Sequence, residues 1–231
     1  MSRLRPAGFG RLSPDIARLR LLQLFDSQFP VGAFAHSGGV ETYASLGGSL
    51  AELRQILHAQ IESGWGRSEL AAAYLAWRAA GSDDDALDLS RLAGTLDALK
   101  VVPSIRDTSV GLGRRTLDLV RRLYPDATPE IARPHHALVV GATARRLGVD
   151  ARDLLLAFAQ SLAMGTLTAA VRCMPVSPAQ AQALLVDIHP RISLAVQRAM
   201  ADPDGSLFTC TPALDIRGHQ QVHLRTRLFQ S

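Results

Sequence analysis

Residues 21–46 read LLQLFDSQFPVGAFAHSGGVETYASL, and this stretch decides how the chain folds. An apolar helical run ends near Asp26. Pro30 then fixes its own φ angle and disfavours the helical region for the residue before it. Gly32 and the pair Gly38-Gly39 permit backbone conformations that other residues resist. The stretch therefore predicts a helix, a rigid corner and a second, short helix.

The polar side chains of this corner allow two interpretations. His36, Ser37 and Glu41 lie among apolar neighbours. They could satisfy backbone groups at the ends of the two helices. Together with Phe34, they could instead form a recognition or metal-handling surface. Residue chemistry alone favours the first interpretation, because only a minority of loops carry function.

The composition outside the corner favours helices. Of the 231 residues, 47% are hydrophobic but only 5% are aromatic, and Ala, Leu and Arg dominate. Sheets favour β-branched and aromatic residues, whereas Ala and Leu favour helices. We predict an all-α fold, a single-domain bundle of about 8–10 helices. Residues 1–12 would be a mobile N-terminal arm, 13–200 the helical domain, and 201–231 an irregular C-terminal tail that docks on a partner.

Caps and apolar periodicity place the individual helices. They predict helices near residues 14–27, 40–46, 70–80, 87–100, 105–124, 133–147, 151–173 and 179–200, and one that the capping-box pattern Ser49–Glu52 opens and that carries apolar residues to Ile61. The most apolar of them, 151–173, is the expected central helix, and Gly165 in its middle predicts a close neighbour. In the 105–124 helix, Arg106, Ser109 and Gly113 share one face. That face is either a tight packing seam or a functional surface.

Charge and cysteine content narrow the environment and the partners. The net charge is +4, and Lys100 is the only lysine. No dense basic run with aromatics appears, so an acidic protein partner is favoured over nucleic acid. Cys173 and Cys210 form no disulfide framework, which fits a reducing cytoplasm. We expect no signal peptide and no membrane span, since no apolar run reaches the required length of about 18–20 residues.

Motifs for catalysis and stable metal binding are absent from the sequence. There is no phosphate loop, dinucleotide fingerprint or HExxH motif. His135 and His136 point about 100° apart on a helix, which favours solvent or capping roles. His219 and His223 have i, i+4 spacing but are weak metal candidates outside a predicted helix. The open alternatives are a small metal-dependent hydrolase using His135, His136 and a carboxylate, and a helical nucleic-acid binder.

The corner pattern Pro-x-Gly-x-Phe-x-x-Ser-x-Gly-x-Glu at residues 30–41 resembles the N-terminal signature of the UreF family of urease accessory proteins. Three later segments are also similar to that family. They are Arg106, Asp107, Ser109, Gly113 and Arg115; His135-His136, Gly141, Ala170-Val171-Arg172-x-x-Pro175 and Gln182; and Arg227-Leu228-Phe229-x-Ser231. Val176-Ser177-Pro178 departs from the usual Leu-Gly-Gln turn, and Val40 replaces the commoner Leu.

The resemblance implies a non-enzymatic, dimeric cytoplasmic chaperone. Such proteins bind UreH (also called UreD), recruit the GTPase UreG, and help deliver nickel to apo-urease. No stably bound cofactor is implied, only nickel in transit. The resemblance leaves open the dimer geometry and whether the GTPase is activated or restrained.

The resemblance also suggests roles for individual residues. A face for UreG, or a nickel route, would comprise Phe34, His36, Ser37, Glu41, Arg106 and Ser109. The tail that docks on UreH would use Arg225, Arg227, Leu228 and Phe229. Structural roles would fall to Pro30, Gly32, Gly39, Gly113, Arg172 and Pro175. No catalytic residue is expected.

Overall fold

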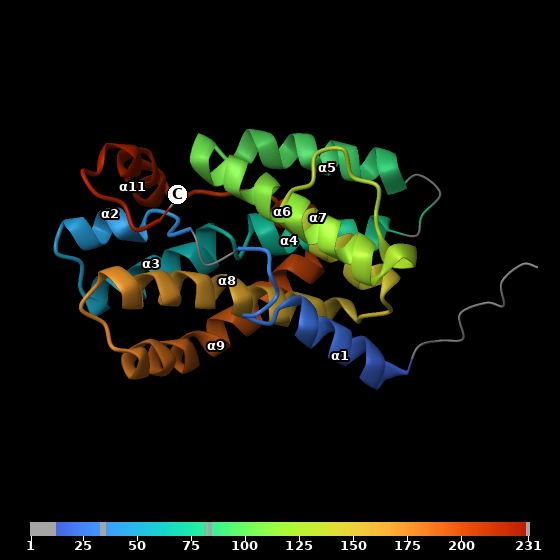
Figure 1. Cartoon of the computed structure of the whole chain (residues 1–231), viewed down its shortest axis with the longest axis horizontal. Coiled ribbons are helices and arrows are strands. Elements are labelled where there is room, and N and C mark those ends of the chain that lie inside the picture. The colour runs from blue at the N-terminus through green and yellow to red at the C-terminus, as the bar shows by residue number, and fades with distance from the viewer. Residues whose placement is uncertain (1–12, 33–35, 81, 83–84, 230–231) are drawn as a thin grey trace, which may run out of the picture.

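The computed structural model describes residues 13–32, 36–80, 82 and 85–229, and these residues form an all-α fold (Figure 1). The predicted N-terminal arm, residues 1–12, lies outside them. The helices are α1 (Pro14–Leu24), α2 (Val40–Ser45), α3 (Leu50–Ser63), α4 (Ser68–Ala79), α5 (Asp85–Leu99), α6 (Pro103–Leu123), α7 (His136–Arg146), α8 (Ala151–Cys173), α9 (Pro178–Ala201), α10 (Pro203–Ser206) and α11 (Pro212–Gln220), with short 3₁₀ turns at Pro125–Ala127 and Gln221–His223. The described residues contain no strand, so the predicted fold class is confirmed.

Helix α4 lies at the centre of the bundle because its side chains are small. Ala71, Ala72, Ala73 and Ala76 are fully buried. This lets α7 approach so closely that a Cβ atom on Gly141 would lie 2.2 Å from the Ala73 carbonyl oxygen. Around this contact, residues of α3, α5, α8 and α9 complete the main hydrophobic core.

Helix α8 has the predicted bounds and contributes the fully buried Phe158 to the core. Its length and a mean hydropathy of 1.7 would suffice to cross a membrane, contrary to the expectation from the sequence. A buried core helix passes the same test, and half of its most apolar window is buried inside the molecule. The close neighbour predicted for Gly165 is wrong, since no described atom lies within 4 Å of a Cβ atom placed there.

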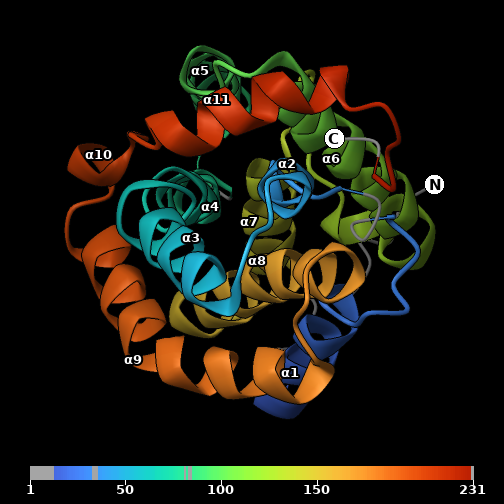
Figure 2. The same cartoon turned by 90° about the vertical axis from the view of Figure 1, so that its left-hand side faces the viewer.

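The C-terminal segment is helical and packed, not irregular as predicted. Pro203 and Pro212 each occupy the start of a helix, where a missing N–H costs nothing. Helix α11 lies against α2 and the start of α6 (Figure 2). The contact is close because Gly218 has no side chain: a Cβ atom there would lie 3.3 Å from Val102. Tertiary contacts, not local propensity, thus order this segment.

Candidate functional site

Three glycines shape the backbone in the described part of the corner. Gly32, Gly38 and Gly39 adopt φ angles of 72°, 58° and 93°, which side-chain-bearing residues rarely tolerate. Arg115 of α6 donates a hydrogen bond from Nε to the Val31 carbonyl and thereby ties the corner to that helix. A Cβ atom on Gly39 would lie 3.3 Å from the Gly218 backbone nitrogen. Phe34 lies in residues 33–35, outside the described part of the chain.

Glu41 joins the corner to the C-terminal segment. Its carboxylate accepts hydrogen bonds from Gln221 Nε2, at 3.1 Å, and from the backbone N–H of Leu228. The hydroxyl of Thr42 donates to the Arg217 carbonyl at 2.9 Å. Two segments that are about 180 residues apart in sequence therefore form one structural unit.

The structure buries two side chains that were predicted to form a recognition surface. Ser37 is only 4% exposed and Glu41 only 6%. The Ser37 hydroxyl has no hydrogen-bond partner among the described residues. In this conformation Glu41 ties the corner to the C-terminal segment, whereas the Ser37 side chain is enclosed without such a bond.

His36 and Arg106 remain near solvent. The His36 ring nitrogen Nδ1 lies 3.3 Å from the Thr108 hydroxyl on α6. Burial, with a smaller effect of the Arg115 guanidinium, lowers the pKa of His36. Arg106 is half-exposed on the same helix. The Nε2 atom of His36 is buried, so Arg106 is the more accessible of these two residues of the predicted face.

The predicted Ser109–Gly113 face is a packing seam inside the chain. A Cβ atom on Gly113 would lie 1.7 Å from the Pro134 carbonyl oxygen, so α6 touches the backbone that leads into α7. Ser109 as a whole residue is 8% exposed. Its hydroxyl donates to His135 Nδ1 at 3.1 Å. His135 Nε2 in turn donates to the Asp97 carboxylate at 3.1 Å. Serine, histidine and aspartate thus lie in the order of a serine-hydrolase triad, but the two ring nitrogens are exchanged relative to it and the serine is buried.

His135 is buried, His136 is half-buried, and the His135 side chain makes no capping hydrogen bond, so the favoured solvent or capping roles are wrong. His135 is fully buried in the chain of hydrogen bonds just described, and His136 packs edge-on against Phe158, 5.5 Å between ring centroids. Burial lowers the pKa of His136 to about 4. The two rings contact different neighbours, and among the described residues no group of three metal-ligating side chains includes them.

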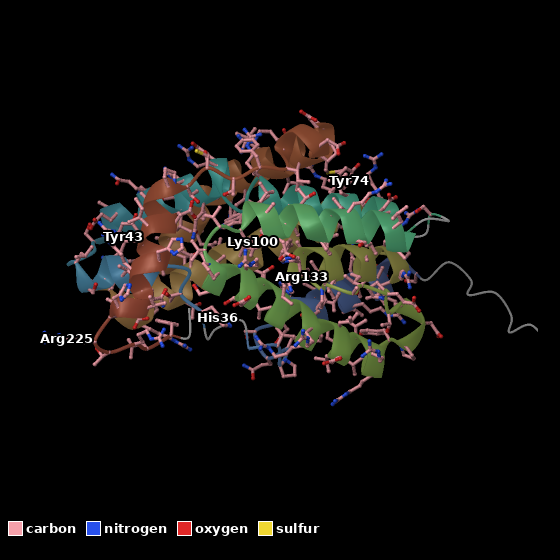
Figure 3. The ribbon with its side chains drawn as sticks, turned by 90° about the horizontal axis from the view of Figure 1, so that it is seen from above. His36, Tyr43, Tyr74, Lys100, Arg133 and Arg225 are labelled. Atoms are coloured by element: carbon pink, nitrogen blue, oxygen red, sulfur yellow. The ribbon has the colours of Figure 1, made fainter. Side chains whose placement is uncertain are left out.

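A buried ion pair lies near the two histidines. The Lys100 ammonium and the Glu69 carboxylate form an ion pair with only 10% and 11% of their side chains exposed. Burial alone would raise the pKa of Glu69, but Lys100 more than offsets this and holds it below its usual value. Figure 3 shows Lys100 near the middle of the molecule, not far from Arg133, which pairs with Asp97. Helices α4 and α5 are thus joined to the start of α7 by charge as well as by packing.

A cavity of about 160 Å³ lies between this ion pair and α11. Its polar walls come from the Glu69–Lys100 pair, Thr211 and Asp215, and Trp65 closes part of its apolar side. Burial raises the pKa of Asp215. The volume has room for a few water molecules or a small hydrated cation.

The predicted docking residues of the tail divide into an anchor and an exposed surface. Phe229 is 4% exposed and belongs to the main core. Arg225, Arg227 and Leu228 are exposed, Leu228 by 71%. Figure 3 shows Arg225 at the end of the molecule that carries the C-terminal segment. Ile216 and Val222 add exposed apolar side chains to the same segment, which gives it a basic and apolar surface.

The remaining predicted residues gain little support as sites. His219 ends α11 and His223 lies in the 3₁₀ turn that follows. Among the described residues, no three His, Cys, Asp or Glu side chains converge as metal ligands. Arg172 lies in the last turn of α8, and Pro175 follows that helix. Their structural roles stay predictions.

Sequence reasoning missed several residues that build this region. Asp97, Glu69 and Gln221 are charged or polar partners supplied by distant helices, and no local pattern marks them. Lys100 did carry a signal, because a single lysine among many arginines is unusual. The structure places it in a buried ion pair with Glu69.

Comparison with known proteins gives one consistent result. The model of the UreF family matches residues 49–189. A urease accessory protein UreF from Nostoc sp. is 31% identical over 220 residues, covering 92% of this chain and 95% of the relative. Proteins of the same name from Haemophilus influenzae and Marinobacter nauticus are 32% and 30% identical, with 91% and 94% of this chain covered and 94% and 95% of theirs.

Proposed function

The chain belongs to the UreF family of urease accessory proteins, and from this premise we propose that it is a non-enzymatic assembly factor for urease. As a cytoplasmic homodimer it would bind UreH (also called UreD) and recruit the GTPase UreG. The assembly would then deliver nickel to apo-urease. This chain would supply surfaces and a route for the ion and would make no bonds itself.

The observation that carries this proposal is the union of the corner with the C-terminal segment. The hydrogen bonds of Glu41 hold the segment so that Arg225, Arg227 and Leu228 face solvent. Exposed guanidinium groups beside an exposed leucine suit an acidic protein surface with an apolar centre. We assign this surface, the docking surface, to UreH.

The corner, which forms one structural unit with the C-terminal segment, is assigned to UreG and to nickel. His36 and Arg106 are both partly exposed beside the corner, and Ser37 and Glu41 are buried next to them in the sequence or the fold. The cavity under α11 supports an ion route, because Glu69 and Asp215 place two carboxyl groups on its wall. Lys100 would neutralise Glu69 while no cation is present.

A co-purification experiment tests the assignment of the docking surface. Arg227→Glu with Leu228→Asp should reduce co-purification of UreH at least tenfold, because both the charge and the apolar contact are lost. Leu87→Asp is the matched control: Leu87 is 52% exposed on α5, so this variant should bind UreH normally. Helical circular dichroism should be the same for all three proteins.

The broader proposal has its own test in cells. A strain that lacks this chain should make urease protein with little bound nickel, and the wild-type chain should restore the nickel content. Fully nickel-loaded urease in the deletion strain at ordinary nickel levels would contradict the proposal. Unchanged UreH binding by the double variant would contradict only the docking surface.

A further inference from the structure

The outward side of α9 is apolar along most of its length. Ala179, Ala183, Val186, Pro190 and Leu194 recur every three or four residues, and all are exposed. Val186 and Leu194 are 64% and 57% exposed. Residues at this spacing form one continuous row on a helix. We call this row the α9 ridge.

The α9 ridge is not needed to attach α9 to the rest of the chain. The opposite side of the helix already provides a complete buried stripe, composed of Ala181, Leu184, Leu185, Ile188, Ile192, Ala195, Val196 and Ala199. On a helical wheel the two rows lie about 180° apart. A helix that is apolar on two opposite sides is typical of one covered by protein on both.

The polar side chains of α9 are displaced to its flanks. On one flank Asp187 pairs with Arg54 of α3 at 3.0 Å, and Arg191 pairs with Glu62 of the same helix. On the other flank the Gln182 amide lies 3.9 Å from the Met164 sulfur of α8. The ridge is therefore an uncharged centre with a polar rim, which is the usual layout of a protein interface.

We propose that the α9 ridge receives the α9 ridge of a second copy of this chain, with the two helices antiparallel across a two-fold axis. The inference rests on the proposed homodimer and names its interface. Two-fold pairing about the midpoint between Val186 and Asp187 sets Ala179 opposite the partner's Leu194. It also sets Ala183 opposite the partner's Pro190, and Val186 close to its own symmetry mate. Small side chains thus meet large ones along the whole row, which is the condition for close packing between helices.

Helix α8 can complete the interface. A stable dimer usually buries about 800 Å² on each partner, which is more than one helical ridge provides. Beyond Gln182, α8 is only half-buried at Ser161, Met164 and Gly165, and Gly165 has open space around it. The surface from the α9 ridge to these residues is continuous through the contact between Gln182 and Met164.

This placement leaves the proposed partner surfaces free. Helix α9 runs along the side of the molecule away from α11, as both views of the fold show (Figures 1 and 2). Each copy in the dimer would therefore still expose its own docking surface. A symmetric complex with one UreH on each copy follows from this geometry.

Site-directed crosslinking tests the proposal in the full-length chain. With the exposed Cys210 replaced by serine, Val186→Cys should form a covalent dimer under mild oxidation, because the two sulfur atoms would meet near the two-fold axis. Leu87→Cys, on another exposed surface, should remain monomeric on a non-reducing gel. Ala179→Cys and Leu194→Cys chains should crosslink when mixed and not when each is oxidised alone.

Charge substitution provides an independent measurement. Val186→Glu with Leu194→Glu should weaken dimerisation at least tenfold in sedimentation velocity, because two carboxylates would meet at the two-fold axis and one more would be buried against Ala179 at each end of the row. Leu19→Glu with Leu22→Glu is the matched control: both residues are about as exposed, at 65% and 66%, but lie on α1. That control should leave the dimer unchanged.

The outcomes separate this inference from the proposed function. If the α9 variant stays dimeric and Val186→Cys does not crosslink, the α9 ridge is not the interface, although the homodimer stands. If the Leu19→Glu with Leu22→Glu variant dissociated the dimer instead, the interface would lie on α1 and the inference would be overturned. Loss of UreH binding with an intact dimer would show that UreH covers the ridge. A wild-type chain that is monomeric at micromolar concentration would contradict the homodimer itself.

Discussion

At the scale of single residues, two glycines in long helices should respond in opposite ways to alanine. Gly113→Ala places a Cβ atom 1.7 Å from the Pro134 carbonyl oxygen and should lower the free energy of unfolding by about 3 kcal/mol or more. Gly165→Ala meets no described atom within 4 Å and should raise it by about 0.5–1 kcal/mol through helix propensity. Urea denaturation measures both. Equal effects would mean that α6 does not touch the backbone before α7.

The buried histidines make stability depend on pH. The pKa of His136 is lowered from 6.5 to about 4, so between these values the unfolded chain binds more protons than the folded chain. Stability should therefore fall as the pH decreases through this range, by about 2 kcal/mol for His136 at pH 5. His135 has a lowered pKa for the same reason, burial, and should add to the loss. Urea denaturation at pH 7 and pH 5 should show the loss, and His136→Phe should reduce it.

Residue-level prediction worked where the cause is local and failed where the partner is distant. The positive φ angles of Gly32 and Gly39 followed from the corner sequence, because only a residue without a side chain adopts them easily. The burial of Glu41 could not be predicted, since its hydrogen-bond donors, Gln221 and Leu228, come from the other end of the chain. The contacts of His135 and His136 depend in the same way on residues distant in sequence, namely Asp97, Ser109 and Phe158.

At the scale of elements, the C-terminal segment should be released when Glu41 loses its carboxylate. Glu41→Ala leaves the Gln221 amide and the Leu228 N–H without their acceptor, at a cost of about 1–3 kcal/mol for each donor that stays buried. Backbone hydrogen exchange should then speed up in residues 212–229. Glu41→Gln keeps one acceptor oxygen and should have a smaller effect.

The control for that release is another glutamate with a local role. Glu52 completes the capping box of α3 by accepting from the Ser49 backbone N–H at 3.0 Å. Glu52→Ala should cost about 1 kcal/mol of stability and leave exchange in residues 212–229 unchanged. If both variants accelerated exchange there equally, Glu41 would not hold the segment specifically.

Elements with their own caps were the ones that the sequence could place. The capping boxes at Ser49 and Ser177 open α3 and α9 as their patterns indicate. Helix α11 was missed because its start, Thr211, makes no side-chain cap and its stability comes from α2 and α6. The departure from the family turn at 176–178 is likewise understood locally: Ser177 and Pro178 cap and begin α9.

At the scale of the whole molecule, two hydrophobic clusters meet at α8. The larger contains Leu155 and Phe158, and the smaller, formed with α1 and the end of α6, contains Leu154. Phe25 packs against both clusters. Adjacent residues of one helix thus belong to different clusters, so neither cluster can unfold while the other keeps α8 in place. The single domain predicted from composition should therefore behave as one cooperative unit.

The two tryptophans allow this cooperativity to be measured. Trp65 packs against the larger cluster, while Trp77 packs against the smaller one and donates from its indole N–H to the Val149 carbonyl at 2.9 Å. Fluorescence of Trp77→Phe and of Trp65→Phe should each report one cluster. Circular dichroism of each variant gives the midpoint for unfolding of its helices, including the stability cost of the substitution. In each variant the fluorescence midpoint should equal this circular dichroism midpoint. If the folded chain forms the proposed homodimer, that midpoint should also rise with protein concentration. Separate midpoints for the two tryptophans would mean that α8 does not unite the clusters, and a midpoint independent of concentration would mean that folding and association are not linked.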